Sequence, residues 1–136
     1  MGGFFGVASK EDCMLDVFFG VDYHSHLGTR RGGLAAYDKD IGLQREIHNT
    51  ENSPFRTKFE NIFDEMRGTS AIGCISDSDP QPLLIRSKLG IYAICIVGRI
   101  NNTEELLKAY FASSGGHFDA MTGGKVNSCL LYTSDA

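Results

Sequence analysis

The sequence predicts an α+β fold in which sheets are packed between helices. Three observations lead to this prediction: a short apolar segment near the N-terminus, an amphipathic segment near each end of the chain, and several short apolar segments between them. A strand, a helix, a run of strands with small helices and a last helix, in that order, are typical of layered sheets covered by helices. With 136 residues, 42% of them hydrophobic, the chain is long enough for one domain with a core and too short for two.

The N-terminal third is predicted to contain a buried strand, a helix and a pair of strands. The apolar residues 3–7 are interrupted by glycine and are typical of a strand. Residues 9–12, Ser-Lys-Glu-Asp, resemble a capping box. The apolar stripe that follows has helical spacing, so a helix is expected from Cys13 to about His24. The next two strands are expected at residues 33–37 and 42–47, on either side of a turn at 38–40.

The remainder of the chain is predicted to alternate between short helices and strands. A short helix is expected over residues 59–66, where apolar residues recur at helical spacing. The apolar segments at 71–75, 83–85 and 90–97 are predicted strands. The last of these is rich in Ile and Tyr, so a central strand buried on both faces is expected there. A capped helix is expected over residues 102–111.

Composition argues against several classes of protein. The formal net charge is −4 and the basic residues are scattered singly, whereas a nucleic-acid-binding surface needs them clustered. No apolar run approaches the roughly 20 residues that span a bilayer, and the N-terminus lacks the pattern of a secretory signal. We therefore expect a cytoplasmic protein with neither a nucleic acid nor a membrane as partner.

The cysteines are far apart in the sequence and include no C-x-x-C pair. This spacing favours neither a zinc site nor a disulfide framework. Buried free thiols in a reducing cytosol are the preferred interpretation. The residues concerned are Cys13, Cys74, Cys95 and Cys129.

Four groups of residues could carry chemistry. Residues 29–33, Thr-Arg-Arg-Gly-Gly, could meet an anion, although a solvated turn is the preferred interpretation. The Asp-Ser-Asp at 77–79 has too few oxygens for calcium, and the His-Ser-His at 24–26 is more typical of a helix end than of a metal site. No metal site is therefore predicted. Gly98 follows an apolar segment and could offer its N–H to an oxyanion.

Four blocks carry a resemblance to a known family. They read Met-Gly-Gly-Phe-Phe-Gly-Val at 1–7, Leu-Gly-Thr-Arg-Arg-Gly-Gly-Leu-Ala-Ala at 27–36, Ala-Ile-Gly-Cys-Ile-Ser at 71–76 and Cys-Ile-Val-Gly-Arg-Ile-Asn-Asn at 95–102. Their order and spacing resemble the N-terminal class II glutamine amidotransferase domain of the amidophosphoribosyltransferases, over roughly residues 1–128. The family's blocks read Met-Cys-Gly-Ile-Phe-Gly-Val, Leu-Gln-His-Arg-Gly-Gln-Asp-Ser-Ala-Gly, Gly-Ile-Gly-His-Thr-Arg and Ala-His-Asn-Gly-Asn-Leu-Val-Asn.

The chain departs from this family at the catalytic positions. The resemblance places Gly2 where the family has its Cys nucleophile. Val97 stands in place of the Asn that helps to hold the oxyanion, although Gly98 and its N–H remain. Ser76 stands in place of the Arg that binds the glutamine carboxylate, while Arg30 matches the family's Arg beside the nucleophile.

The chain is therefore predicted to have no catalytic residue and no glutaminase activity. The family's Asp that receives the substrate amine would lie near Asn127 or Ser128, where the sequence has no carboxylate. Loss of one oxyanion donor alone costs about 2.7–4 kcal/mol of transition-state stabilisation.

The resemblance implies an Ntn-hydrolase-like, four-layer αββα sandwich of two antiparallel sheets between helices, incomplete at its C-terminus. The amidotransferase-like domain would cover residues 1–127. The last residues, 128–136, do not fit the family's continuation and are interpreted as read-through of a sequencing adapter, a short genuine strand being the alternative.

The family forms phosphoribosylamine from glutamine in de novo purine synthesis. A downstream phosphoribosyltransferase domain is the implied partner, in a homo-oligomer. Magnesium and phosphoribosyl pyrophosphate would bind only to that domain, so no cofactor is expected in this chain.

Two other functions remain open. One is an amidotransferase whose nucleophile has moved to Cys74 or Cys95. Both thiols lie in apolar, strand-like segments, where burial is expected to raise the pKa and leave the thiol inert. The other is a regulatory or scaffolding module that binds a small molecule or a partner protein in the vacated cleft.

Overall fold

The computed structural model describes residues 2–28, 30–77, 79–98, 100–114, 121–122 and 125–126. The chain divides into two compact units, Met1–Val97 and Gly98–Ala136. The predicted tail at 128–136, with Cys129, and the position Asn127 lie outside the described residues.

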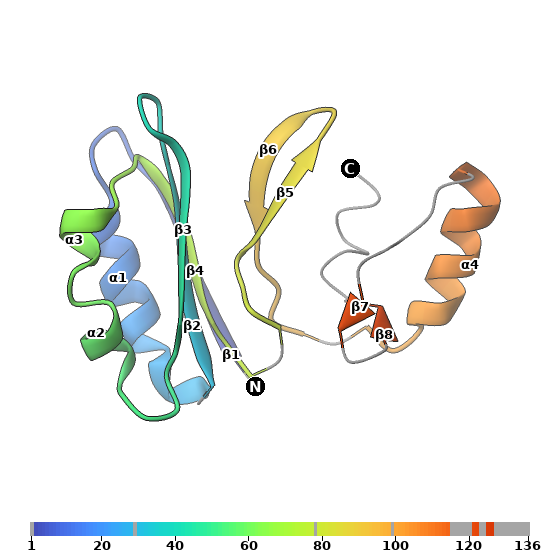
Figure 1. Cartoon of the computed structure of the whole chain (residues 1–136), viewed down its shortest axis with the longest axis horizontal. Coiled ribbons are helices and arrows are strands. Elements are labelled where there is room, and N and C mark those ends of the chain that lie inside the picture. Colours follow the sequence, from blue (N-terminus) through green and yellow to red (C-terminus); the bar gives the residue numbers. More distant parts are fainter. Residues whose placement is uncertain are drawn as a thin grey trace. The chain divides into compact units, whose positions relative to one another are not determined.

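A four-stranded antiparallel sheet organises the first unit, with the strand order β1-β4-β2-β3 (Figure 1). Four of the predicted strands are confirmed, and each is slightly longer than expected. Their bounds are β1 (Gly2–Ala8), β2 (Arg31–Asp38), β3 (Gly42–Asn49) and β4 (Ser70–Ser76).

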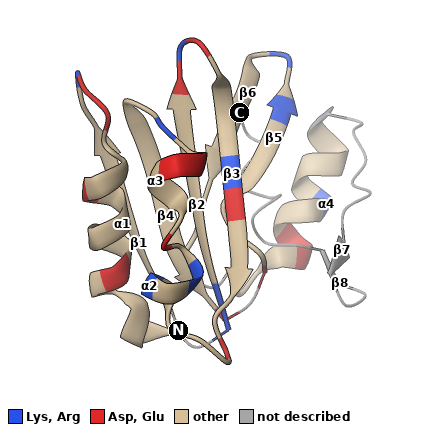
Figure 2. Ribbon diagram, turned by 60° about the vertical axis from the view of Figure 1, so that its left-hand side comes forward, with Lys and Arg blue, Asp and Glu red and all other residues tan. Residues whose placement is uncertain are grey.

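Charged residues are unevenly distributed among the strands. Strands β1 and β4 contain no charged residue, whereas the edge strand β3 carries Arg45 and Glu46 (Figure 2). Strand β4 lies between β1 and β2 and is buried over most of its length, so an unpaired charge within it would be costly.

Helices cover one face of this sheet (Figure 1). They are α1 (Met14–Tyr23), the 3-10 helix η1 (Ser25–Leu27), α2 (Phe55–Lys58) and α3 (Ile62–Glu65). The rings of Phe18 and Phe55 lie 5.7 Å apart, and Phe55 stacks on Phe59 at 4.4 Å. Burial of these rings stabilises the unit through the hydrophobic effect. The core cluster consists of Cys13, Met14, Val17, Phe18, Val21, Leu34, Ala36, Phe55, Phe59, Ile62, Met66, Ala71 and Ile75.

The helix predicted from Cys13 to about His24 is confirmed as α1, but two details of the helical regions were wrong. The N-cap of α1 is Cys13, whose side chain makes no capping bond, and the Ser9 hydroxyl instead accepts the N–H of Glu11 at 3.2 Å. The single helix expected over 59–66 is replaced by α2 and α3. Phe59, Ile62 and Met66 are buried as the spacing predicts, whereas Phe63 is 46% exposed, and the spacing alone did not show where one helical turn ends and the next begins.

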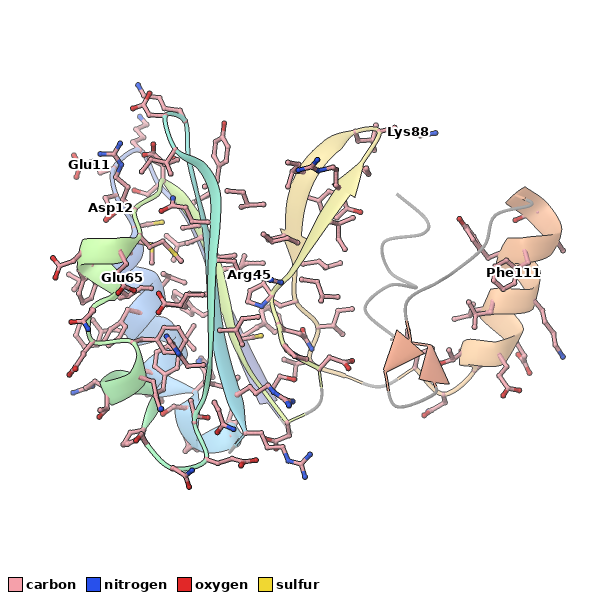
Figure 3. All side chains as sticks on the ribbon, in the orientation of Figure 1. Glu11, Asp12, Arg45, Glu65, Lys88 and Phe111 are labelled. Atoms are coloured by element: carbon pink, nitrogen blue, oxygen red, sulfur yellow. The ribbon has the colours of Figure 1, made fainter. Side chains whose placement is uncertain are left out.

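A two-stranded antiparallel sheet, β5 (Leu83–Ser87) and β6 (Gly90–Ile94), lies on the opposite face (Figure 1). A Cβ added to Gly32 would lie 2.7 Å from the Phe55 ring, whereas one on Gly33 would lie 1.7 Å from the carbonyl oxygen of Gln81. Successive residues of a strand face opposite sides, so the sheet is covered on both. Arg45 of β3 reaches towards the segment before β5 and donates to the Pro82 carbonyl at 3.3 Å (Figure 3).

The prediction of a central strand over 90–97, buried on both faces, was wrong. Strand β6 ends at Ile94, pairs with β5, and leaves Ile91 54% exposed. The segment from Cys95 to Val97 is not a strand. A short apolar run indicates a strand but does not reveal how many neighbours that strand has.

The second unit contains α4 (Thr103–Ser114), β7 (Met121–Thr122) and β8 (Lys125–Val126). The predicted helix at 102–111 is confirmed. Its first turn is closed by a bond from the N–H of Leu106 to the carbonyl of Asn102 at 3.1 Å. Among the helices that the structure describes, none is long and apolar enough to cross a bilayer.

Candidate functional site

One end of the four-stranded sheet holds several of the predicted site residues. Gly2 of β1 and Arg31 of β2 both pair with Ser76 of β4. A Cβ added to Gly2 would lie 2.3 Å from the carbonyl oxygen of Ile75. That oxygen belongs to the backbone, so any side chain at residue 2 would require β1 to shift. The position that the resemblance gives to the nucleophile therefore has no reactive atom and little room for one.

Ser76 is buried and hydrogen-bonded to a neighbour rather than open to a ligand. It is 6% exposed, and its hydroxyl accepts a bond from Gln81 Nε2 at 3.5 Å. Gln81 is also buried, and its Oε1 accepts the N–H of Ile96 at 2.6 Å. Gln81 thus joins the end of β4 to the segment after β6. A neutral hydroxyl cannot replace a guanidinium, which binds a carboxylate through two parallel, charge-assisted hydrogen bonds.

Gln81 was missed by sequence reasoning. Its only signal is a polar residue between two prolines, Pro80 and Pro82, which indicates a turn rather than a buried hydrogen-bonding group.

Arg30 lies at the same end of the sheet and faces acidic partners. Its backbone N–H donates to Asp77 Oδ1 at 3.1 Å, and its Nη1 donates to the Asp77 carbonyl at 3.5 Å. Its Nε lies 4.0 Å from Glu51 Oε1, at an exposed position. The predicted basic turn is therefore hydrogen-bonded to the loop that contains Asp77, and its groups are not arranged around an anion. Thr29 and Ser78, the remaining members of the two predicted loops, lie outside the described residues.

The two histidines occupy a helix end, as the preferred interpretation held. His24 Nδ1 donates to the Gly20 carbonyl at 2.7 Å, and the ring packs edge-on against Tyr23. His26 lies in η1 and is exposed. Within the described part of the chain, no three His, Cys, Asp or Glu residues are grouped as a metal site would require.

Val97 and Gly98, the predicted oxyanion remnants, are both exposed. Val97 ends the first unit and Gly98 begins the second. The hydrogen bond from the Ile96 N–H to Gln81 Oε1 fixes the residue that precedes Val97. The assignment of an oxyanion role to Gly98 stays a prediction.

The thiols differ more than the sequence suggested. Cys13 is fully buried, and burial raises its pKa, the nearby Asp12 carboxylate adding to this. Cys74 is buried within β4, as predicted. Cys95 was expected to lie inside a strand, and this was wrong: it lies beyond β6 and is partly exposed. A hydrogen bond from the Cys74 thiol lowers the pKa of Cys95, with burial opposing the shift.

A cavity of about 280 Å³ lies between the four-stranded sheet and β6. Its lining is mostly apolar and is drawn from the end of the sheet that is remote from Gly2 and Ser76. The buried hydroxyl of Tyr92 has no hydrogen-bond partner among the described residues. The lining residues are Ala35, Tyr37, Leu43, Ser70, Ala71, Ile72, Ile91, Tyr92 and Ala93.

Comparison with known proteins shows similarity at the level of structure. No protein-family profile and no curated protein sequence matches this chain. The glutamine phosphoribosylpyrophosphate (PRPP) amidotransferase of B. subtilis, solved with ADP and GMP, superimposes with a TM-score of 0.75 and 21% identity, over 98% of this chain and 28% of that chain. The allosteric regulatory enzyme of purine biosynthesis superimposes with a TM-score of 0.68 and 24% identity, over 88% of this chain and 27% of that chain.

These two similarities establish the fold and the extent of the match. The chain spans just over a quarter of the length of either solved protein. The resemblance noted in the sequence is confirmed at the level of fold, and the chain has the mixed α/β, antiparallel architecture of the N-terminal domain of PRPP amidotransferase.

Proposed function

We propose that this chain is an amidotransferase-like domain that has lost glutaminase activity. In a longer protein it would serve a phosphoribosyltransferase that uses free ammonia, or ammonia delivered by another protein. The observation that carries the proposal is Gly2, at the start of β1, with the Ile75 carbonyl oxygen occupying the space of a side chain.

The chemistry of amide hydrolysis supports this proposal. The covalent route needs an activated nucleophile, and residue 2 provides none. Ser76 holds a neutral hydroxyl where a substrate carboxylate would need a cation, and Val97 has no donor for an oxyanion. Because catalytic residues act as a unit, the effects of losing them on the reaction rate are not additive. Removal of the nucleophile alone abolishes the covalent route.

The similarity to PRPP amidotransferase supports the remaining parts of the proposal. The complete domain would be a four-layer αββα sandwich. The partner would be a phosphoribosyltransferase domain that binds magnesium and PRPP, in a cytoplasmic homo-oligomer acting in purine synthesis. Residues 1–127 would form the amidotransferase-like domain, and no cofactor would bind to it.

A glutaminase assay tests the loss of activity. The purified chain is incubated with glutamine, and the glutamate released is measured beside the B. subtilis PRPP amidotransferase as positive control. We expect no glutamate above the blank for the chain or for Gly2→Cys, because the added Cβ meets the Ile75 oxygen and Ser76 still lacks a charge. Glutamine hydrolysis that disappears on substitution of Gly2 or Arg30 would overturn the proposal.

The relocated nucleophile is tested with a glutamine-mimicking electrophile. The lowered pKa of Cys95 favours this candidate over Cys74, which is fully buried. Labelling of Cys95 that free glutamine competes away would support a working amidotransferase. Labelling that glutamine leaves unchanged would reflect thiol reactivity alone and would support the loss of function.

A second candidate function is the binding of a small, largely apolar molecule in the cavity beside β6. The buried Tyr92 hydroxyl, which has no partner among the described residues, supports a ligand with one hydrogen-bonding group. Thermal unfolding with a panel of amino acids, nucleotides and small aromatic compounds tests this candidate. A ligand at 100 times its dissociation constant stabilises the folded state by about 2.7 kcal/mol.

A further inference from the structure

Cys74 and Cys95 are brought together by the fold although they are far apart in the sequence. Cys74 lies in β4, between Phe4 of β1 and Gly33 of β2. Its neighbour Gly73 faces the helices, since a Cβ there would lie 2.5 Å from Val21. Alternation along the strand therefore directs Cys74 to the opposite face, which β5 and β6 cover. Cys95 is the first residue after β6.

An independent contact holds the two segments in place. Gln81 donates to the Ser76 hydroxyl at 3.5 Å and accepts the Ile96 N–H at 2.6 Å. Ser76 lies two residues beyond Cys74 on the same face of β4, and Ile96 directly follows Cys95. One buried side chain thus bridges the same two segments that the thiols join. The fold therefore holds the two segments that carry the thiols next to each other.

The two thiols have complementary roles. Cys74 is fully buried and donates a hydrogen bond to Cys95. Cys95 is partly exposed, which is the condition for a small reagent to approach this residue. A partly exposed thiol that accepts a hydrogen bond is the attacking group in thiol–disulfide exchange, and a buried neighbour is the resolving group.

From this geometry we infer that Cys74 and Cys95 form a redox-sensitive pair that closes into a disulfide by exchange with a low-molecular-weight disulfide. The Cys95 thiolate attacks one sulfur of the reagent and forms a mixed disulfide, releasing the first small thiol. Cys74 then loses its proton to solvent and attacks Cys95 Sγ, releasing the second small thiol. Two protein thiols are oxidised and one reagent disulfide is reduced to two thiols. The bond fixes the segment before Val97 onto β4.

This inference goes beyond the proposed function and does not depend on it. The resemblance places His and Ala, not two cysteines, at these positions in the family, so the pair belongs to this chain. The pairing requires only that the first unit folds as described.

Peptide mapping of the full chain tests the inference. The protein is incubated with glutathione disulfide, its remaining thiols are blocked with iodoacetamide, and it is digested with trypsin. The cysteines lie in separate tryptic fragments, 68–86 and 89–99. We expect these fragments to be linked, with a mass two hydrogens below their sum, and the link to disappear on reduction.

Variants identify the order of the steps. Cys95→Ser should abolish the link, whereas Cys74→Ser should stop at a glutathione adduct on Cys95. Cys13→Ser is the matched control and should leave the link unchanged, because Cys13 lies in the core on the helix side. Without oxidant, iodoacetamide should label Cys95 at least about tenfold faster than Cys13.

Three results would overturn the inference. They are a stable glutathione adduct on Cys95 in the unmodified protein, a disulfide from Cys95 to another cysteine, and both thiols remaining free after the treatment. A link that forms equally fast in denaturant would also overturn it, since the fold would then play no part.

Discussion

The carboxylate of Asp12 accepts the backbone N–H of Gly68 at 2.9 Å, joining residues 56 positions apart in the sequence. Its second oxygen accepts the N–H of Met14, at the start of α1, at 3.4 Å. The N–H of Cys13 in turn donates to the Gly68 carbonyl at 2.8 Å. One side chain therefore fixes where α1 begins and where the chain enters β4.

Replacing Asp12 tests this link. Asp12→Ala removes the acceptor of two backbone N–H groups, so we expect it to lower the free energy of unfolding by about 1–2 kcal/mol. Glu11→Ala is the matched control. Glu11 is the exposed neighbouring acid, and its replacement should change stability by less than about 0.5 kcal/mol (Figure 3). Urea denaturation followed by circular dichroism measures both, and equal effects would show that the Asp12 carboxylate does not join these segments.

The aromatic cluster under the helices is expected to dominate the stability of the first unit. Phe59 is 1% exposed, stacks on Phe55, and meets the His48 ring at 4.8 Å. Phe59→Ala should therefore cost about 3–5 kcal/mol, from lost burial and the cavity that remains. Phe63→Ala removes a ring that is 46% exposed and should cost about 1 kcal/mol. A Phe63→Ala variant as unstable as Phe59→Ala would contradict the described packing.

Elements that have a local periodic pattern could be predicted from the sequence, whereas contacts between distant residues could not. Strand β1 and helix α1 were predicted because their apolar residues repeat with the period of one element. The register of Gly2 on Ser76 is a contact between distant residues, which periodicity does not encode. The same applies to Gln81 and to the approach of Cys95 to Cys74, both of which depend on how the chain turns before β5. The altered residues of the site were found because the blocks around them resemble a known family.

Gly33 is expected to be essential for the packing of the segment before β5. A Cβ there would lie 1.7 Å from the carbonyl oxygen of Gln81, so Gly33→Ala must displace backbone and should cost about 1–3 kcal/mol. Gly6→Ala, in β1 of the same sheet, is the matched control. Its Cβ would lie 3.5 Å from Ile72, an ordinary contact, and Ala is favoured over Gly in a strand by about 0.5–1 kcal/mol. Thermal unfolding should thus move in opposite directions for the two variants.

The acidic pair between β3 and α3 predicts a pH dependence (Figure 2). A side-chain hydrogen bond with Glu46, and the charge of Glu46, raise the pKa of Glu65. A carboxyl whose folded-state pKa is raised stabilises the fold below its unfolded pKa, and this contribution is lost as the pH rises through the folded-state pKa. Glu65→Gln should therefore raise the midpoint of thermal unfolding at neutral pH, with the gain disappearing at acidic pH. Glu60→Gln, an exposed acid nearby, should show no such difference; a matching gain would contradict the pairing.

Gln81 is expected to control how firmly the segment after β6 is held. Gln81→Leu keeps the volume but removes the acceptor of the Ile96 N–H, and burial of that unpaired group should cost about 1–3 kcal/mol. Gln44→Leu is the matched control, because Gln44 also bonds a distant backbone, that of Arg67, at 2.6 Å and 3.3 Å. Those bonds are exposed, so water replaces them and the cost should stay within about 0.5 kcal/mol. Hydrogen exchange should accelerate at the Ile96 amide in the first variant alone, and unchanged exchange there would show that Gln81 does not hold the segment in solution.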